Sequence, residues 1–295
     1  MRVNPYLTAD LLAALQRTQQ EEQTALLQLS SGKRINQPSD DPAGTAILLR
    51  LQDRLDSSDQ YLQSIGSVRG QLQTADSALN SVGLALQRAV SLGIEGANGT
   101  LSDANRASIA TELQGIQDQV VSLANTSFQG RYLFSGTATL TKPYTPDPNA
   151  ALGIRYDGNA GTNQVEIGDG FRLQTNQPGS QVFGTGGNSM FQAMQNLIQA
   201  MQSGTGIDAA VSGVRASYDS ISQHRVFYGN AVNQLDAQTT SLKSEKVELS
   251  SQQEAVAGAD PIAAASQLSN AQNSRQATLQ GMAKVMQVNL FDYLR

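Results

Sequence analysis

The stretch YLQSIGSVRGQLQTADSALNSVGLALQRA, residues 61–89, decides the fold, because its apolar side chains recur in alternating steps of four and three residues. The positions are Tyr61, Ile65, Val68, Leu72, Ala75, Leu79, Val82, Leu86 and Ala89. This period keeps the side chains on one side of an α-helix only when helices wrap around one another. The stretch therefore predicts a long helix packed within a bundle.

Two other segments carry the same period. The shorter one has its stripe at Ile109, Leu113, Ile116, Val120 and Leu123. The longer one passes through Val211, Val214, Tyr218, Ile221, Arg225, Tyr228, Val232, Leu235, Thr239, Leu242, Lys246, Leu249, Gln253 and Val256. A helix over residues 208–256 would be roughly 70 Å long at about 1.5 Å per residue, which suits an elongated subunit better than a compact domain.

Residues at the expected helix ends agree with this interpretation. Asp41-Pro42 and Asp260-Pro261 each fit an N-cap aspartate followed by proline at the first helical position. Ser102-Asp103 offers a cap for the helix that carries the shorter stripe. Residues 93–99 and 204–206 are rich in glycine and interrupt the period, so we expect turns or linkers there.

Between the helical segments the pattern changes. Residues 154–156, 164–167 and 171–175 are short β-prone pieces among Gly, Pro, Asn and Asp, and residues 157–161 form a turn that would join the first two pieces as strand, turn and strand. We expect a small β domain inserted at the tip of a helical hairpin. Because the chain enters and leaves this domain through helices, both termini should lie at the same end.

The sequence thus predicts a mainly α fold, an elongated helical bundle or coiled coil with a small inserted β domain. We expect residues 1–40 with 258–295 to form a terminal coiled-coil layer. Residues 41–136 with 188–257 should form the helical bundle, and residues 137–187 the β domain.

The composition excludes several function classes. The chain has 295 residues and no cysteine, which excludes disulfides, thiolate metal sites and a cysteine nucleophile. A net charge of −5 without a basic run offers little to nucleic acid. The apolar run at residues 11–15 is short for a signal peptide, and no stretch approaches the length of a membrane span. We expect a soluble protein that leaves the cell, if at all, without a cleaved leader.

Candidate catalytic and metal-binding residues have simpler interpretations. His224 is the only histidine, so classical triads and common zinc sites lack their parts. Asp157, Asn159 and Asp169 carry oxygen ligands that Ca²⁺ accepts, but turn chemistry explains them better. We expect no enzymatic activity, no cofactor and no metal.

The connector before the first long helix holds a second carboxyl pair. Asp40 and Asp41 precede Pro42, which places them at a helix start, where anionic side chains meet free backbone amides. We interpret them as capping residues and not as an acid–base pair. Lys33 and Arg34 lie in the same connector, and either a contact with a neighbouring subunit or a plain solvated turn would explain them.

Both chain ends carry amphipathic helical patterns whose apolar residues suit assembly. The two predicted helices bury too little to offset the entropy of ordering them, so we expect them to be largely unstructured in a monomer and to order between subunits. Near the C-terminus, a methionine-containing cluster suits a seam with different partners, although an ordinary intramolecular core remains an alternative. The predicted assembly residues are Leu11, Leu15, Leu26, Leu29, Leu268, Leu279, Met282, Met286, Leu290 and Phe291.

Two strings at the chain ends resemble a known family. Residues 29–47, LSSGKRINQPSDDPAGTAI, and residues 268–294, LSNAQNSRQATLQGMAKVMQVNLFDYL, are similar to the terminal motifs of bacterial flagellins and flagellar hook-associated proteins. Prolines at 38 and 42, the string GRYLFSG at 130–136 and the ending at 289–294 favour a hook-associated member that forms the hook–filament junction. The alternatives are a filament flagellin and an unrelated secreted coiled-coil adhesin or exoprotein.

The resemblance implies a structural role in the bacterial flagellum. Terminal helices of many copies would pack as the inner coiled-coil layer of a tube, with the β domain at its surface. The partners would be further copies of the chain, another hook-associated protein on the hook side and flagellin on the filament side. The chain would pass through the flagellar type III export channel, aided by a cytoplasmic chaperone bound near the C-terminal helices, to an extracellular location.

Overall fold

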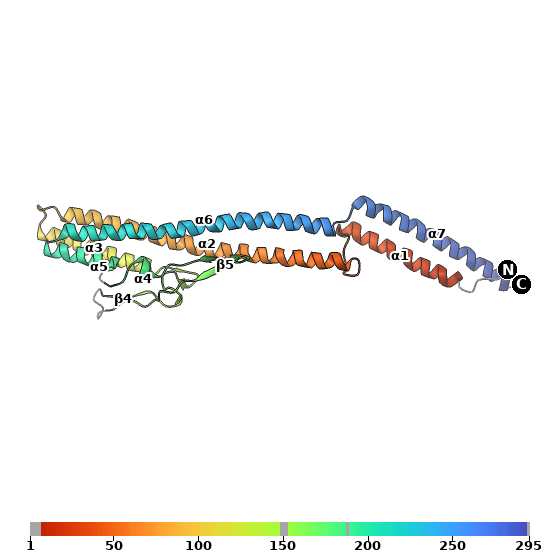
Figure 1. Ribbon diagram of the computed structural model, residues 1–295, viewed down its shortest axis with the longest axis horizontal. Coiled ribbons are helices and arrows are strands. Elements are labelled where there is room, and N and C mark those ends of the chain that lie inside the picture. The colour runs from red at the N-terminus through yellow and green to blue at the C-terminus, as the bar shows by residue number, and fades with distance from the viewer. Residues whose placement is uncertain (1–6, 148–152, 187–188, 294–295) are drawn as a thin grey trace. The chain divides into compact units, whose positions relative to one another are not determined.

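The structure is a computed structural model that describes residues 7–147, 153–186 and 189–293, with side chains from residue 9 to residue 284 within those ranges (Figure 1). In chain order the elements are α1 (Leu7–Ser31), α2 (Pro42–Gly96), α3 (Asp103–Ala124), β1 (Ser127–Phe128), β2 (Arg131–Tyr132), β3 (Tyr144–Pro146), β4 (Ile154–Tyr156), β5 (Gln164–Gly168), β6 (Phe171–Gln174), α4 (Gly179–Val182), α5 (Met190–Ser203), α6 (Ile207–Ala257) and α7 (Pro261–Tyr293). None of the helices among these residues is long and apolar enough to cross a membrane.

The chain divides into two compact units. We call terminal unit the described residues up to Ser57 together with those from Ser244 onward, and central unit residues Ser58–Lys243. Both boundaries fall inside the long helices α2 and α6. The three-part division expected from the sequence stays a prediction.

The long helices confirm the prediction made from the seven-residue period. Helix α6 covers Ile207–Ala257, against an expected span of 208–256. On α2 the striped positions from Ile65 to Ala89 are all buried. On α6 the striped positions of the central unit are all buried or half-buried, and the polar residues among them are Arg225 and Thr239. The mainly α fold class is confirmed.

The predicted helix starts are also confirmed. The Asp41 carboxylate accepts the N–H of Gly44 at 2.9 Å, and α2 begins at Pro42. Asp260 accepts the N–H of Ile262 at 2.8 Å in front of α7. Ser102 caps α3 by accepting the N–H of Asn105. Each cap satisfies a backbone donor that the first helical turn leaves unpaired.

The turn expected at residues 93–99 is wrong in its first half, because α2 continues to Gly96. A Cβ at Gly93 would collide with Val211, and one at Gly96 would collide with Met201. These glycines therefore allow close packing of neighbouring helices, which outweighs the low intrinsic helix propensity of glycine.

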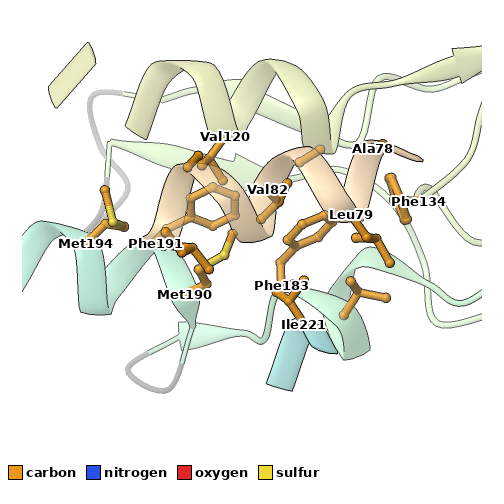
Figure 2. Close-up of a cluster of buried hydrophobic side chains, with 14 of the residues drawn as sticks. Ala78, Leu79, Val82, Val120, Phe134, Phe183, Met190, Phe191, Met194 and Ile221 are labelled. Carbon is orange, nitrogen blue, oxygen red and sulfur yellow. The ribbon is translucent and has the colours of Figure 1, made fainter. Parts of the chain in front are cut away.

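One core holds the central unit together. Aromatic side chains from the segment between α3 and α5 enter it, and the rings of Phe134 and Phe183 meet edge to face with centroids 5.2 Å apart. Figure 2 shows Phe183 and Phe191 against Leu79 and Val82 of α2. The strands and the helices therefore share a single hydrophobic cluster.

The strands form three separate antiparallel pairs, β1 with β2, β3 with β4 and β5 with β6. Residues 154–156 and 164–167 are strands, as expected, but they do not pair with each other across the intervening turn. Tyr156 of β4 instead lies opposite Tyr144 of β3, with ring centroids 5.1 Å apart. Asn159, in the expected turn, hydrogen-bonds the backbone and hydroxyl of Thr137, which holds the loop away from a simple hairpin.

Candidate assembly surface

Helices α1 and α7 lie side by side in antiparallel orientation in the terminal unit (Figure 1). Arg275 of α7 pairs with Glu22 of α1 at 2.6 Å. At one end of the pair, the N–H of Ala259 donates to the carbonyl of Gly32 at 2.9 Å. Helices α1 and α7 therefore form one antiparallel helix pair.

The contact between these helices buries mainly small side chains. Among the side chains of α1 and α7 that the structure describes, the fully buried apolar ones are Ala25, Ala264 and Ala271. A buried alanine removes much less apolar surface from water than a buried leucine, so this pair gains little hydrophobic stabilisation from its own contact.

Large apolar side chains remain in water on the same helices. The exposed ones are Leu12 at 53%, Leu26 at 55%, Leu27 at 44%, Leu29 at 41%, Ile262 at 80% and Leu279 at 46%. Several large apolar side chains exposed on one helix pair are candidates for contact with another chain. The arrangement provides a surface that another chain can cover.

The predicted assembly residues fall into three groups. Leu26, Leu29 and Leu279 are exposed. The half-buried ones are Leu11, Leu15, Leu268 and Met282. The side chains of Met286, Leu290 and Phe291 lie outside the described residues. The assembly role of the set, and the alternative of an intramolecular core for its C-terminal cluster, remain predictions.

The predicted assembly set lacks Leu12 and Leu27. Both are exposed, and they widen the apolar surface of α1. The available signal was the presence of leucines on more than one face of α1, a pattern expected when a helix is covered from several sides.

The connector between α1 and α2 is organised by its two aspartates. Asp40 accepts the backbone N–H groups of Asn36 and Gln37, each at 2.9 Å. The backbone N–H of Gly44 and then the guanidinium of Arg34 lower the pKa of Asp41. Asp41 therefore binds an amide in the first turn of α2, as a capping residue does, whereas Asp40 binds amides of the connector before the helix and does not cap it.

The backbone of the connector also pairs with the segment before α7. Lys33, an exposed residue, forms an antiparallel bridge with Gly258. The N–H of Arg34 donates to the carbonyl of Ala257 at 2.6 Å. The connector thus lies against the end of α6 within the terminal unit.

Two of the residues considered for catalysis or metal binding, His224 and Asp157, have side-chain partners within the protein. His224 is half-buried, and its Nδ1 lies 3.1 Å from the side-chain oxygen of Gln177; burial lowers the pKa of the imidazole. The Asp157 carboxylate pairs with Arg155, which lowers the pKa of the carboxyl. Within the described ranges, no group of three or more His, Cys, Asp or Glu side chains is placed to hold a metal ion.

Arg225 interrupts the apolar stripe of α6 for a structural reason. Its guanidinium makes two hydrogen bonds to the Asp76 carboxylate of α2, at 2.9 and 3.2 Å. A two-pronged pair between helices matches best in one register, so it specifies how α2 and α6 align. The sequence showed the charge within the stripe but not its partner.

Family models match both ends of the chain. The bacterial flagellin N-terminal helical region matches residues 4–139, and the bacterial flagellin C-terminal helical region matches residues 211–294. Together they cover α1, α2, α3, most of α6 and α7.

Curated relatives include hook-associated proteins and flagellins. Flagellar hook-associated protein 3 of Escherichia coli is 32% identical over 179 residues, which span 60% of this chain and 52% of that protein. The protein of the same name from Salmonella typhimurium is 34% identical over 53% of this chain and 48% of its own length. The flagellin of Listeria innocua is 25% identical over 81% of this chain and 79% of its own length. The chain spans about half the length of the two hook-associated relatives.

Solved structures share the fold. A putative flagellar hook-associated protein from Vibrio parahaemolyticus superposes with a TM-score of 0.68 at 24% identity, over 74% of this chain and 99% of that chain. The flagellar junction protein from Legionella pneumophila gives a TM-score of 0.63 at 14% identity, over 72% of this chain and 100% of that chain.

Proposed function

We propose that this chain, which belongs to the bacterial flagellin family, is a structural and non-enzymatic subunit that joins the flagellar filament to the hook. The observation that carries the proposal is the set of exposed leucines on α1 and α7. The similarity to flagellar hook-associated protein 3 of two organisms favours a place at the junction over other places in the flagellum.

The apolar surface on the terminal helices supports self-association as the function of this subunit. An exposed leucine gains free energy when a partner removes it from water. Further copies of α1 and α7 supply matching apolar helices, so copies of the chain would cover one another in a ring. A ring of repeated subunits leaves one edge for a second hook-associated protein and the other edge for flagellin.

The remaining parts of the proposal concern location and export. The subunit would act outside the cell at the hook–filament junction, after passage through the flagellar export channel. A cytoplasmic chaperone would cover the C-terminal helix beforehand, since exposed leucines on an unassembled subunit favour aggregation. These partners rest on the family and on the exposed surface.

A filament flagellin is the second candidate, and the long alignment with the flagellin of Listeria innocua favours it. The two candidates differ in how far they polymerise. A flagellin extends long filaments when seeds are added to purified monomer. A junction subunit adds a short zone to hook tips and then stops.

Deletion of the gene tests the junction role directly. The deletion strain should keep its hooks, lose its filaments and release flagellin into the medium, and the wild-type gene should restore filaments. Intact filaments on the deletion strain would refute the proposal. A motile deletion strain with reduced surface attachment would support the adhesin alternative.

A further inference from the structure

Four helix ends meet at one place in the terminal unit. Helix α1 ends at Ser31, α2 begins at Pro42, α6 ends at Ala257 and α7 begins at Pro261. Two short connectors, residues 32–41 and 258–260, join these ends. A residue that fixes the first connector against the end of α6 also affects the direction in which α1 leaves this place.

The side chain of Arg34 joins the first connector to the end of α6. Its Nη2 donates to the Asp41 carboxylate at 3.2 Å and to the carbonyl of Val256 at 3.0 Å. Asp41 is the N-cap of α2, and Val256 lies in the last turn of α6. One guanidinium therefore bridges the start of one long helix and the end of the other.

The charges at this bridge match the helix ends. The anionic Asp41 lies at the N-terminus of α2, where the helix dipole is positive. The cationic Arg34 lies at the C-terminus of α6, where unpaired carbonyls carry negative charge. Both the ion pair and the helix dipoles therefore favour the same arrangement.

We propose that Arg34 is a positioning residue that locks the connector through Asp41 and the Val256 carbonyl, so that α1 and α7 assemble on a fixed base. The lock lies in the first connector and the last turn of α6, and it forms in the single chain before the terminal helices pack between subunits. This inference rests on the proposed junction function for its effect in cells.

Four variants separate the lock from a general change of charge. Arg34→Gln removes the cation, and Asp41→Asn keeps an oxygen for the N–H of Gly44 while it removes the anion. Arg34→Lys keeps the charge without the planar fork. Lys243→Gln removes the same charge from an exposed site in the central unit and serves as the matched control.

The cellular assay measures free flagellin in the medium of complemented deletion strains. Arg34→Gln and Asp41→Asn should each raise the amount of free flagellin about two- to fivefold, the range that loss of an exposed ion pair produces. Arg34→Lys should give an amount between those of these variants and the wild type. The double variant should be no worse than Arg34→Gln alone, because both changes break the same pair. Wild-type levels in Arg34→Gln, or additive effects in the double variant, would overturn the lock.

Amide hydrogen exchange on the purified full chain tests the lock without any flagellar assembly. Residues 32–41 should be protected in wild type and in Lys243→Gln, and should exchange several-fold faster in Arg34→Gln and Asp41→Asn. Equal exchange in all four proteins would refute the lock even if the junction function holds. A deletion strain that releases no flagellin would refute the junction function and leave this exchange result to decide the lock.

Discussion

Replacing Leu26 and Leu29 of α1 with alanine separates assembly from folding. The two leucines are 55% and 41% exposed. Alanine has the highest helix propensity, so the change removes apolar surface without weakening α1 as a helix. The matched change is Leu79→Ala in α2, a leucine that is 0% exposed in the core of the central unit.

The expected magnitudes follow from burial. Complete burial of a leucine contributes about 1.5–3 kcal/mol, so the half that Leu26 and Leu29 leave in water contributes about 1 kcal/mol each when a partner covers it. Both substitutions together should cost about 2 kcal/mol per subunit contact, or roughly 30-fold in association constant. The free energy of unfolding of the monomer should change by less than about 0.5 kcal/mol.

The core substitution should show the opposite pattern. Leu79→Ala removes a fully buried side chain and leaves a cavity, which typically costs about 2–5 kcal/mol of unfolding free energy. It does not alter the exposed leucines of α1. Urea unfolding of the purified chains measures the free energy of unfolding, and restoration of filaments in a deletion strain measures assembly.

Two results would refute this reasoning. One is a loss of unfolding free energy in the Leu26→Ala/Leu29→Ala variant as large as that in Leu79→Ala, since the leucines would then support the monomer. The other is normal filament restoration by the double variant at wild-type expression, since the surface would then have no part in assembly.

Three further predictions concern the helices and the single histidine. In a verified monomer, the amides of residues 7–31 and 261–293 should exchange rapidly, because the pair buries mainly alanines; strong protection at both ends would contradict this. In α2, Gly93→Ala should lower the unfolding free energy by about 1–3 kcal/mol through a clash with Val211. Gly66 has open space around it, so Gly66→Ala should raise the unfolding free energy by about 0.5–1 kcal/mol. Similar melting temperatures for the two variants would argue against close packing at Gly93. Burial lowers the pKa of His224 below its ordinary 6.5, so the unfolded chain takes up the proton at a higher pH than the folded chain, and stability should fall as the pH drops through 6.5. The wild-type melting temperature should therefore be lower at about pH 5 than at about pH 8, and His224→Gln should reduce this difference. An unchanged difference would exclude the histidine as the source of the pH dependence.

Much of the helical framework could be predicted because its signals are local. A seven-residue period places Leu72 and Leu79 on one face, and an aspartate before Pro42 or Pro261 satisfies amides within the next turn. These interactions involve residues a few positions apart, so the sequence already contains both partners. The strand segments at 154–156 and 164–167 were recognisable for the same reason.

The candidate surface could be predicted in part. The apolar patterns at the chain ends identified Leu26, Leu29 and Leu279, which the structure leaves in water. The patterns did not reveal that α1 and α7 meet through alanines, because that depends on how two segments about 250 positions apart approach each other, as Arg275 and Glu22 do.

By itself the sequence determined the mainly α class, the presence of the long helices, their N-terminal caps and the family. Only the tertiary structure decided that β4 pairs with β3, that α2 continues through Gly93, and that Arg225 pairs with Asp76. The same holds for the bridge from Arg34 to the end of α6. The physical reason is that periodicity and capping act within a few turns of one helix, whereas these features depend on which distant side chains and backbone groups the folded chain brings together.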